Sequence, residues 1–148
     1  MVTETLKRIQ YLCDTIPGKL RKISEQEFSL KPSAAVWSKK EILGHLIDSA
    51  SNNHQRFVRV QFEDLPTIFY DQNKWNRSSR YNAMTAQHLI SFWEIFNRHL
   101  CEIAKRIPET DLQRKCRTDN EKTVTLQWLI DDYVVHLEHH LHQLLEYE

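Results

Sequence analysis

Turn-forming residues are scarce in this chain, whose 148 residues include two glycines and four prolines. Together they make up about 4% of the sequence, against roughly 12% in average proteins. Because sheet proteins use glycine and proline in their many turns, this composition favours helices joined by few connections. Two glycines are also too few for a phosphate-binding loop or a dinucleotide-binding motif, both of which are rich in glycine.

Four stretches carry apolar residues at every third or fourth position, which is the spacing of amphipathic helices. We expect helices at about residues 6–23, 38–60 and 85–107, and a fourth from near Thr123 or Thr125 to the end. Pro17 and Gly18 lie inside the first stretch, so we expect a kink or a break there. In the third stretch the residues expected to point inward are Leu89, Phe92, Trp93, Phe96, Leu100, Ile103 and Ile107.

The second helix has a well-marked beginning. Ser38 is placed to cap its free amides, and Glu41 is placed to reach back to Ser38, so that the two residues form a capping box. Trp37 before the cap and Ile42 after it have the spacing of a hydrophobic staple.

Four helices of this length bury their apolar stripes most simply as a four-helix bundle. We therefore predict an all-α fold in which residues 1–148 form a single domain. The connections 28–37 and 108–123 are of moderate length, whereas 62–84 is long enough to cross the bundle. We expect the second and third helices to run parallel, in an up-down-down-up order. The aromatic residues of the long connection are expected to cover one end of the bundle; they include Tyr70, Trp75 and Tyr81.

Charge and composition argue against several classes of protein. Lysine and arginine together number 20, as do aspartate and glutamate, and this zero net charge disfavours a nucleic-acid-binding protein. No apolar run approaches the roughly 18 residues of a membrane span, and the first residues lack the apolar segment of a signal peptide. Three widely spaced cysteines fit a reducing compartment better than a disulfide framework. We therefore expect a cytoplasmic protein with no nucleic-acid or membrane partner.

The sequence contains eight histidines, and four of them lie between positions 136 and 142. His136 and His140 are four residues apart and share one face of the last helix, where two imidazoles form a two-point clamp for a divalent metal. They immediately precede Leu137 and Leu141 and so lie at the edge of the apolar stripe. This edge is expected to face a neighbouring helix.

A third ligand has to come from another helix. His45 stands one position before a leucine of the second apolar stripe, as the two histidines of the last helix do. Gly44 removes a side chain beside His45, which lets another helix come close. His139 and His142 point elsewhere and are expected to be exposed. The candidate metal ligands are therefore His45, His136 and His140.

Spacing alone leaves an alternative open. A histidine at a helix edge is often a partly buried polar residue with no metal. The same pattern therefore fits a metal-free bundle that serves as a non-catalytic binding or stress-response module. Spacing also assigns no catalytic residue.

Three polar residues lie near the candidate ligands in the sequence. Asp48 follows His45 by three residues, and Asp132 precedes His136 by four, so either carboxylate is placed to orient a ligand imidazole through its second N–H. Gln143 shares the histidine face and is a candidate substrate contact.

Two segments resemble motifs of the DinB/YfiT-like superfamily. Residues 37–48, WSKKEILGHLID, resemble its second-helix motif, and residues 133–143, YVVHLEHHLHQ, resemble its fourth-helix motif, HxxxHxxQ. The resemblance implies an up-down-down-up four-helix bundle and a divalent metal held by His45, His136 and His140. It also implies a homodimer, because related bundles often pair.

Characterised relatives in this superfamily include S-transferases and isomerases that use bacillithiol, mycothiol or a similar thiol, and many members are named metal-dependent hydrolases. The resemblance therefore implies an enzyme, an S-transferase or a hydrolase, that acts on a small-molecule substrate. Three imidazoles leave coordination positions open, which is the pattern of a catalytic site. Such a site activates a water or a low-molecular-weight thiol for attack on a small electrophile. Imidazole suits Zn, Ni and Fe, so the sequence does not identify the metal.

Overall fold

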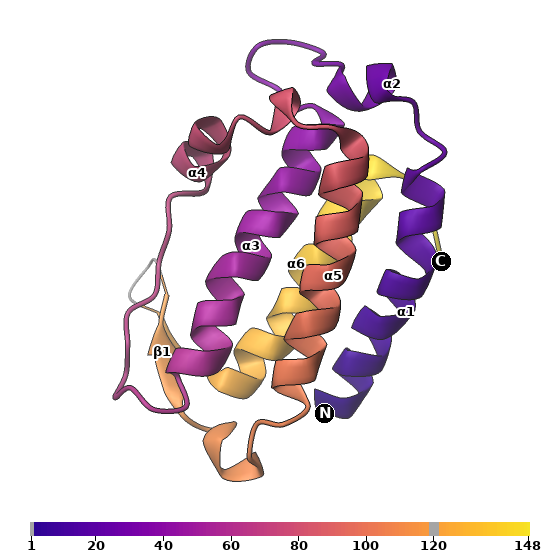
Figure 1. Cartoon of the computed structure of the whole chain (residues 1–148). Helices are drawn as coiled ribbons and strands as arrows, with labels where there is room; N and C mark the ends of the chain where they lie inside the picture. Colours follow the sequence, from indigo (N-terminus) through magenta and orange to yellow (C-terminus); the bar gives the residue numbers. More distant parts are fainter. Residues whose placement is uncertain (1, 119–121) are drawn as a thin grey trace.

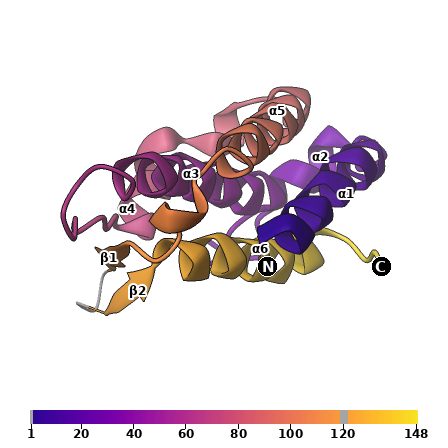
Figure 2. The ribbon, with the colours of Figure 1, turned by 90° about the horizontal axis from the view of Figure 1, so that it is seen from below.

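The computed structural model describes residues 2–118 and 122–148, and four long helices dominate this part of the chain. They are α1 (Val2–Leu20), α3 (Lys39–Arg59), α5 (Ala86–Ala104) and α6 (Leu126–Leu144). α1 and α3 each pack against both α5 and α6, so the four helices enclose one apolar core (Figures 1 and 2). The predicted all-α four-helix bundle is confirmed.

The order of the helices is up-down-down-up, as predicted. α1 runs upward in Figure 1, α3 and α5 both run downward, and α6 returns upward. The parallel pair α3 and α5 requires the chain to travel back along the bundle between them. Residues 60–85 provide that return, and they include the short helices α4 (Gln72–Ser79) and η1 (Tyr81–Ala83). A further short helix, α2 (Glu25–Ser29), lies between α1 and α3.

α1 continues through Pro17 and ends at Leu20, so the predicted break inside the first helix is wrong. Proline lacks an N–H and leaves the carbonyl four residues earlier, that of Cys13, without its helical donor. Arg98 of α5 donates a hydrogen bond to this carbonyl from Nη2 at 3.2 Å. A tertiary contact therefore satisfies the acceptor that proline leaves free.

The predicted capping box at the beginning of α3 is confirmed. Ser38 Oγ accepts a hydrogen bond from the Glu41 amide at 3.2 Å, and the Ser38 amide donates to Glu41 Oε1 at 2.9 Å. The Trp37 ring lies against the His45 imidazole, with ring centroids 5.1 Å apart. The cap therefore fixes the first turns of α3, on which His45 stands.

Phe92 of α5 was expected to point inward, but its side chain is 41% exposed. The buried face of α5 instead includes Ile90 and Trp93, whose spacing from Ala86 and Asn97 follows the period of the helix. Phe92 lies on the outer side of this face, where its ring stacks on His88 with an interplanar angle of 2°.

The long connection lies along the flank of α3, where α4 and η1 pack against that helix. Asn76 of α4 donates a hydrogen bond from Nδ2 to the Glu41 carbonyl at 2.8 Å. The Tyr81 ring of η1 lies directly over Gly44, so closely that a Cβ at this position would overlap the ring. Gly44 therefore permits the close approach of another helix, as expected, and this helix is the short η1. The connection covers the side of α3, not one end of the bundle as predicted.

A two-stranded antiparallel hairpin precedes α6, and the sequence patterns did not predict it. β1 (Lys115–Arg117) pairs with β2 (Thr123–Thr125), with Cys116 opposite Val124. The short helix η2 (Glu109–Asp111) joins α5 to this hairpin, which Figure 2 shows beside the beginning of α6. Thr67 forms a parallel bridge to Arg117, so the hairpin also holds the beginning of the long connection.

In the part of the chain that the structure describes, no helix combines the length and apolar character needed to cross a membrane. The cysteines are free thiols, and all three are buried; they are Cys13, Cys101 and Cys116.

Candidate metal centre

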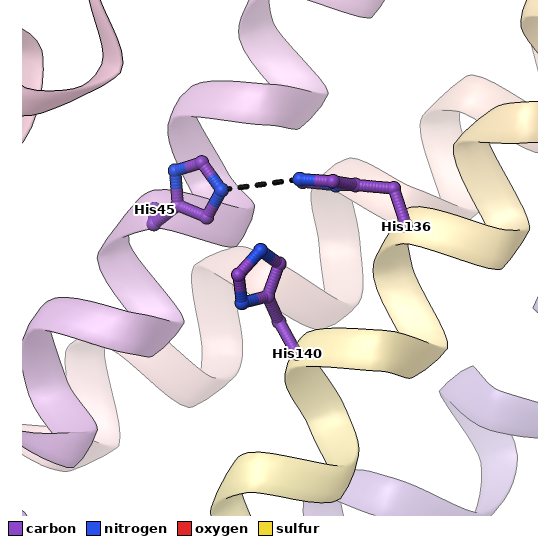
Figure 3. Close-up of side chains that lie close together, drawn as sticks. All are labelled: His45, His136 and His140. Atoms are coloured by element: carbon purple, nitrogen blue, oxygen red, sulfur yellow. Dashed lines mark hydrogen bonds between the residues drawn. The ribbon is translucent and has the colours of Figure 1, made fainter.

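The three predicted ligands meet between α3 and α6. One nitrogen from each of His45, His136 and His140 lies within 4.8 Å of the other two (Figure 3). His45 Nε2 and His136 Nε2 are 3.2 Å apart, and the His140 ring centroid lies 4.6 Å from each of the other two. Within the described residues this is the cluster of three or more ligand-type side chains that is close enough to share one ion.

Local sequence explains this convergence. His136 and His140 are one helical turn apart on α6, and the leucine that follows each of them is buried. The two imidazoles therefore stand at the margin of the core, on the side that faces α3. His45 occupies the facing position on α3, next to buried Leu46, and is itself fully buried.

Burial keeps these imidazoles neutral. Burial, together with the neighbouring His136 and His140, lowers the pKa of His45 from 6.5 to about 3. Burial and the neighbouring histidines also lower the pKa of His136 to about 4. The pKa of His140 is lowered for the same main reason. All three side chains are therefore neutral at pH 7, which is the form in which histidine binds a metal.

One distance between ligand-type nitrogens is that expected for a shared divalent ion. Two imidazole nitrogens at about 2.0–2.1 Å from a tetrahedral zinc ion lie ~3.3 Å from each other. The Nε2 atoms of His45 and His136 are hydrogen-bonded to each other at 3.2 Å, close to that separation, so an ion bound by both would replace this hydrogen bond. No carboxylate or thiol belongs to the cluster in the described chain. The donor set is thus three neutral imidazoles, which leaves at least one coordination position for a water or a substrate.

Gln143 fixes the tautomer of His140. Its Oε1 lies 2.9 Å from His140 Nδ1, and because an amide oxygen only accepts, the imidazole proton stands on Nδ1. Nε2 of His140 then carries the lone pair. Gln143, predicted as a substrate contact, accepts a hydrogen bond from His140 in this structure, and its contact with a substrate stays a prediction.

Asp48 bonds to a different partner from the one predicted. Its carboxylate accepts a hydrogen bond from the hydroxyl of Tyr81, and its second oxygen has no hydrogen-bond partner in the described chain. Burial raises the pKa of Asp48 to about 6, although the hydrogen bond from Tyr81 lowers it. Among the described residues no hydrogen bond joins Asp48 to a ligand histidine, and the Nδ1 atom of His45 is buried without a partner.

A pocket of about 340 Å³ adjoins the cluster between α3 and α6. His136 forms part of its wall, and Asp132, one turn earlier on α6, lines it as well. Burial raises the pKa of Asp132, although nearby Lys122 and Arg56 oppose this effect. Asp132 thus lines the pocket, and among the described residues no hydrogen bond joins it to any of the three imidazoles.

Three polar residues of α3 also line this pocket, and the sequence analysis did not select them as site residues. Ser49, Asn53 and Arg56 follow His45 by four, eight and eleven residues. These steps keep them near one helix face. The same periodicity that selected the histidines contains this signal, because a core-facing stripe that turns polar is unusual for a packed helix.

Comparison with known proteins identifies the family. The sequence profile of the DinB superfamily matches residues 5–144. The chain belongs to the DinB superfamily. This match covers nearly the whole bundle, including all of α3 and α6 and therefore all three histidines.

Relatives of known sequence share about one residue in five with this member of the DinB superfamily. The protein OB0782 of Oceanobacillus iheyensis, named as an inferred metal-dependent hydrolase, is 21% identical over 142 residues, which cover 95% of this chain and 82% of the relative. YfiT of Bacillus subtilis carries the same kind of name and is 21% identical over 146 residues, with the same two coverages.

Solved structures share the fold. The structure of YfiT from Bacillus subtilis, described as an unusual four-helix bundle topology, superposes with a TM-score of 0.79 at 18% identity, covering 94% of this chain and 83% of that one. A mycothiol-dependent maleylpyruvate isomerase superposes with a TM-score of 0.81 at 11% identity, covering 99% of this chain and 62% of that one. The DinB superfamily bundle therefore spans less than two thirds of the isomerase.

Proposed function

We propose that this member of the DinB superfamily is a metal-dependent enzyme that acts on a small molecule, with His45, His136 and His140 as the ligands of one divalent ion. The observation that carries the proposal is the convergence of three neutral imidazoles beside a pocket. The names of the relatives, which refer to metal-dependent hydrolases, support it.

The chemistry follows from an open three-histidine site. A divalent metal bound there supplies the positive charge that lowers the pKa of a coordinated water or thiol and favours its nucleophilic form. Zinc, nickel and iron all suit imidazole ligands. The protein contributes the neutral histidines, the tautomer that Gln143 sets on His140, and the pocket beside His136 that holds the substrate.

Two reactions suit this arrangement, transfer to a low-molecular-weight thiol and hydrolysis. The names of the sequence relatives support hydrolysis, and the mycothiol-dependent isomerase of the same fold supports the use of a thiol. In both reactions we propose that Asp132 contacts the substrate, because its side chain lines the pocket one helical turn from His136.

A metal-free binding module is the second candidate function, and one surface of the bundle favours it. α5 exposes large apolar side chains on its outer face, since Ile95 is 67% and Phe92 41% exposed. A homodimer, which the family resemblance implies, would cover such a face.

We also propose that the protein is cytoplasmic. The free, buried thiols of the described chain support this location.

The metal content of the purified protein separates the two functions. We expect about one divalent ion per wild-type chain and almost none in the double variant His136→Ala/His140→Ala, because removal of two of three ligands leaves no chelating site. The matched control is His139→Ala/His142→Ala, which removes two exposed histidines from the same helix and keeps the metal. Equal metal content in the wild type and the first variant would contradict the enzyme proposal and favour the binding module.

A further inference from the structure

The pocket beside the candidate metal centre contains an arginine that forms no ion pair with any residue that the structure describes. Arg56 of α3 lines this pocket, and among the described residues no carboxylate forms an ion pair with its guanidinium. By contrast Arg59, one turn later, pairs with Glu63 at 2.5 Å. An unpaired guanidinium that is partly removed from water is unfavourable unless a ligand supplies the missing negative charge.

The hydrogen bonds of Arg56 orient the guanidinium but leave most of its donors free. Nη2 donates to the Ile68 carbonyl at 2.8 Å, and Nη1 donates to Asn53 Oδ1 at 3.4 Å. Nε is buried and has no partner in the described chain. Because a guanidinium carries five N–H donors and two are used, three remain. The side chain is thus held in place with donors to spare for a planar oxyanion.

Arg56 and one residue of the candidate metal centre, His136, line the same pocket. Arg56 lies about three turns, or ~16 Å of helix, from His45 along α3. The wall of this pocket includes His136 and Asp132 of α6 together with Ser49, Asn53 and Arg56 of α3. A molecule in this pocket can therefore contact both Arg56 and His136.

The other residues that line the pocket indicate what kind of molecule it binds. Aromatic rings from the long connection and from α6 line the pocket, among them Phe69, Tyr70 and Trp128. Lys122 lies over the Trp128 ring at 4.2 Å and adds a second positive charge, while Asp132 adds one negative charge. The protein part of the pocket thus carries one net positive charge. A volume of about 340 Å³ suits a small ligand.

We propose that the substrate of this site is a small carboxylate with an apolar or aromatic body, and that Arg56 binds the carboxylate. The carboxylate accepts hydrogen bonds from the free guanidinium donors, the body lies between the aromatic rings, and the other end of the molecule faces the histidines. This inference rests on the proposed function, because it places the reacting end of the substrate at the metal centre.

Benzoate and its neutral analogue benzamide test the proposal without any reaction. In chelator-treated protein, calorimetry is expected to show that benzoate binds at least about tenfold more tightly than benzamide, because charge-assisted hydrogen bonds to Arg56 are available only to the anion. Arg56→Gln is expected to reduce this preference to less than about twofold. Arg59→Gln, the matched control on the same helix, is expected to keep it. No preference in the wild type, or a preference that survives in Arg56→Gln, would overturn the proposal.

A measurement on the wild type alone covers the case in which Arg56→Gln fails to fold. Benzoate is expected to shift the Nε–H resonance of Arg56 in nuclear magnetic resonance spectra, whereas benzamide leaves it nearly unchanged. Shifts confined to residues outside the pocket would contradict the proposal. Because the chelator-treated protein is used, a chain that binds no metal still gives a clear result. Failure of the metal proposal and failure of the carboxylate proposal are therefore distinguishable.

Discussion

One buried hydrogen bond, between Asp48 and Tyr81, holds the first half of α3 to the long connection. Asp48 is 3% exposed, and the hydroxyl of Tyr81 is the hydrogen-bond donor to its carboxylate in the described chain. Burial raises the pKa of Asp48 from 3.8 to about 6, so the group is mostly ionised at pH 8 and mostly protonated at pH 5. A buried charge with one donor depends strongly on that donor. The Asp48–Tyr81 pair therefore links the first half of α3 to the long connection in a pH-dependent way.

Tyr81→Phe tests this link. Loss of the hydroxyl leaves the ionised carboxylate without a donor, so we expect a loss of about 2 kcal/mol in the free energy of unfolding at pH 8. At pH 5 the carboxyl of Asp48 is neutral and the loss falls to about 1 kcal/mol or less. Urea denaturation of the metal-free protein at the two pH values measures both. Tyr11→Phe, at an exposed position, is the control and should change stability by less than about 0.5 kcal/mol at either pH. A Tyr81→Phe loss that is larger at pH 5 would refute the pair.

At the scale of elements, the spacing of residues along the sequence was enough to predict the long helices and the residues that share a helix face. The long helices α1, α3, α5 and α6 and the capping box at Ser38 follow from local spacing, and so do the three histidines, because residues four apart on a helix must share a face. The hairpin was missed because three-residue strands are too short to show an alternation of apolar and polar residues. The eight-residue helix α4 was missed because it is polar and has a single buried residue.

Contacts between elements that are distant in the sequence could not be predicted from local spacing. The Tyr81–Asp48 hydrogen bond, the support of the Cys13 carbonyl by Arg98 and the pocket position of Arg56 each join residues from separate elements or depend on packing between them. The outward turn of Phe92 is of the same kind, because Ile90 and Phe92 are equally apolar and only packing against α3 and α1 decides between them.

The approach of η1 to α3 depends on Gly44. A Cβ at this position would overlap the Tyr81 ring, which is buried and therefore has little room to move. Gly44→Ala gains about 1 kcal/mol of helix propensity, but the overlap is expected to outweigh this gain and to destabilise the protein by about 1–3 kcal/mol overall. Gly18→Ala is the matched control, because Gly18 lies inside α1 and no heavy atom would lie within 4 Å of its Cβ. Chemical denaturation should therefore show a lower free energy of unfolding for Gly44→Ala and a higher one for Gly18→Ala. A Gly44→Ala protein as stable as Gly18→Ala would show that Tyr81 moves aside freely.

For the whole molecule, the up-down-down-up order has a consequence for the site. α3 and α6 run antiparallel and face each other, so a candidate ligand from the first half of the chain meets two candidate ligands from its end. The same pair of helices forms the pocket that extends from His136 to Arg56. Any change that shifts α3 against α6 therefore alters the metal centre and the pocket together. The order of the helices could be predicted from the lengths of the connections, whereas the pocket depended on the path of the long connection along α3.

Crystals of the protein soaked with Zn²⁺ and measured at the zinc absorption edge test the central claim most directly. We predict one strong anomalous peak between α3 and α6, at about 2.0–2.1 Å from one nitrogen each of His45, His136 and His140. We also predict that this peak is absent from the His136→Ala/His140→Ala variant. Zinc bound elsewhere on the chain, with His45 Nε2 still hydrogen-bonded to His136 Nε2, would contradict the account.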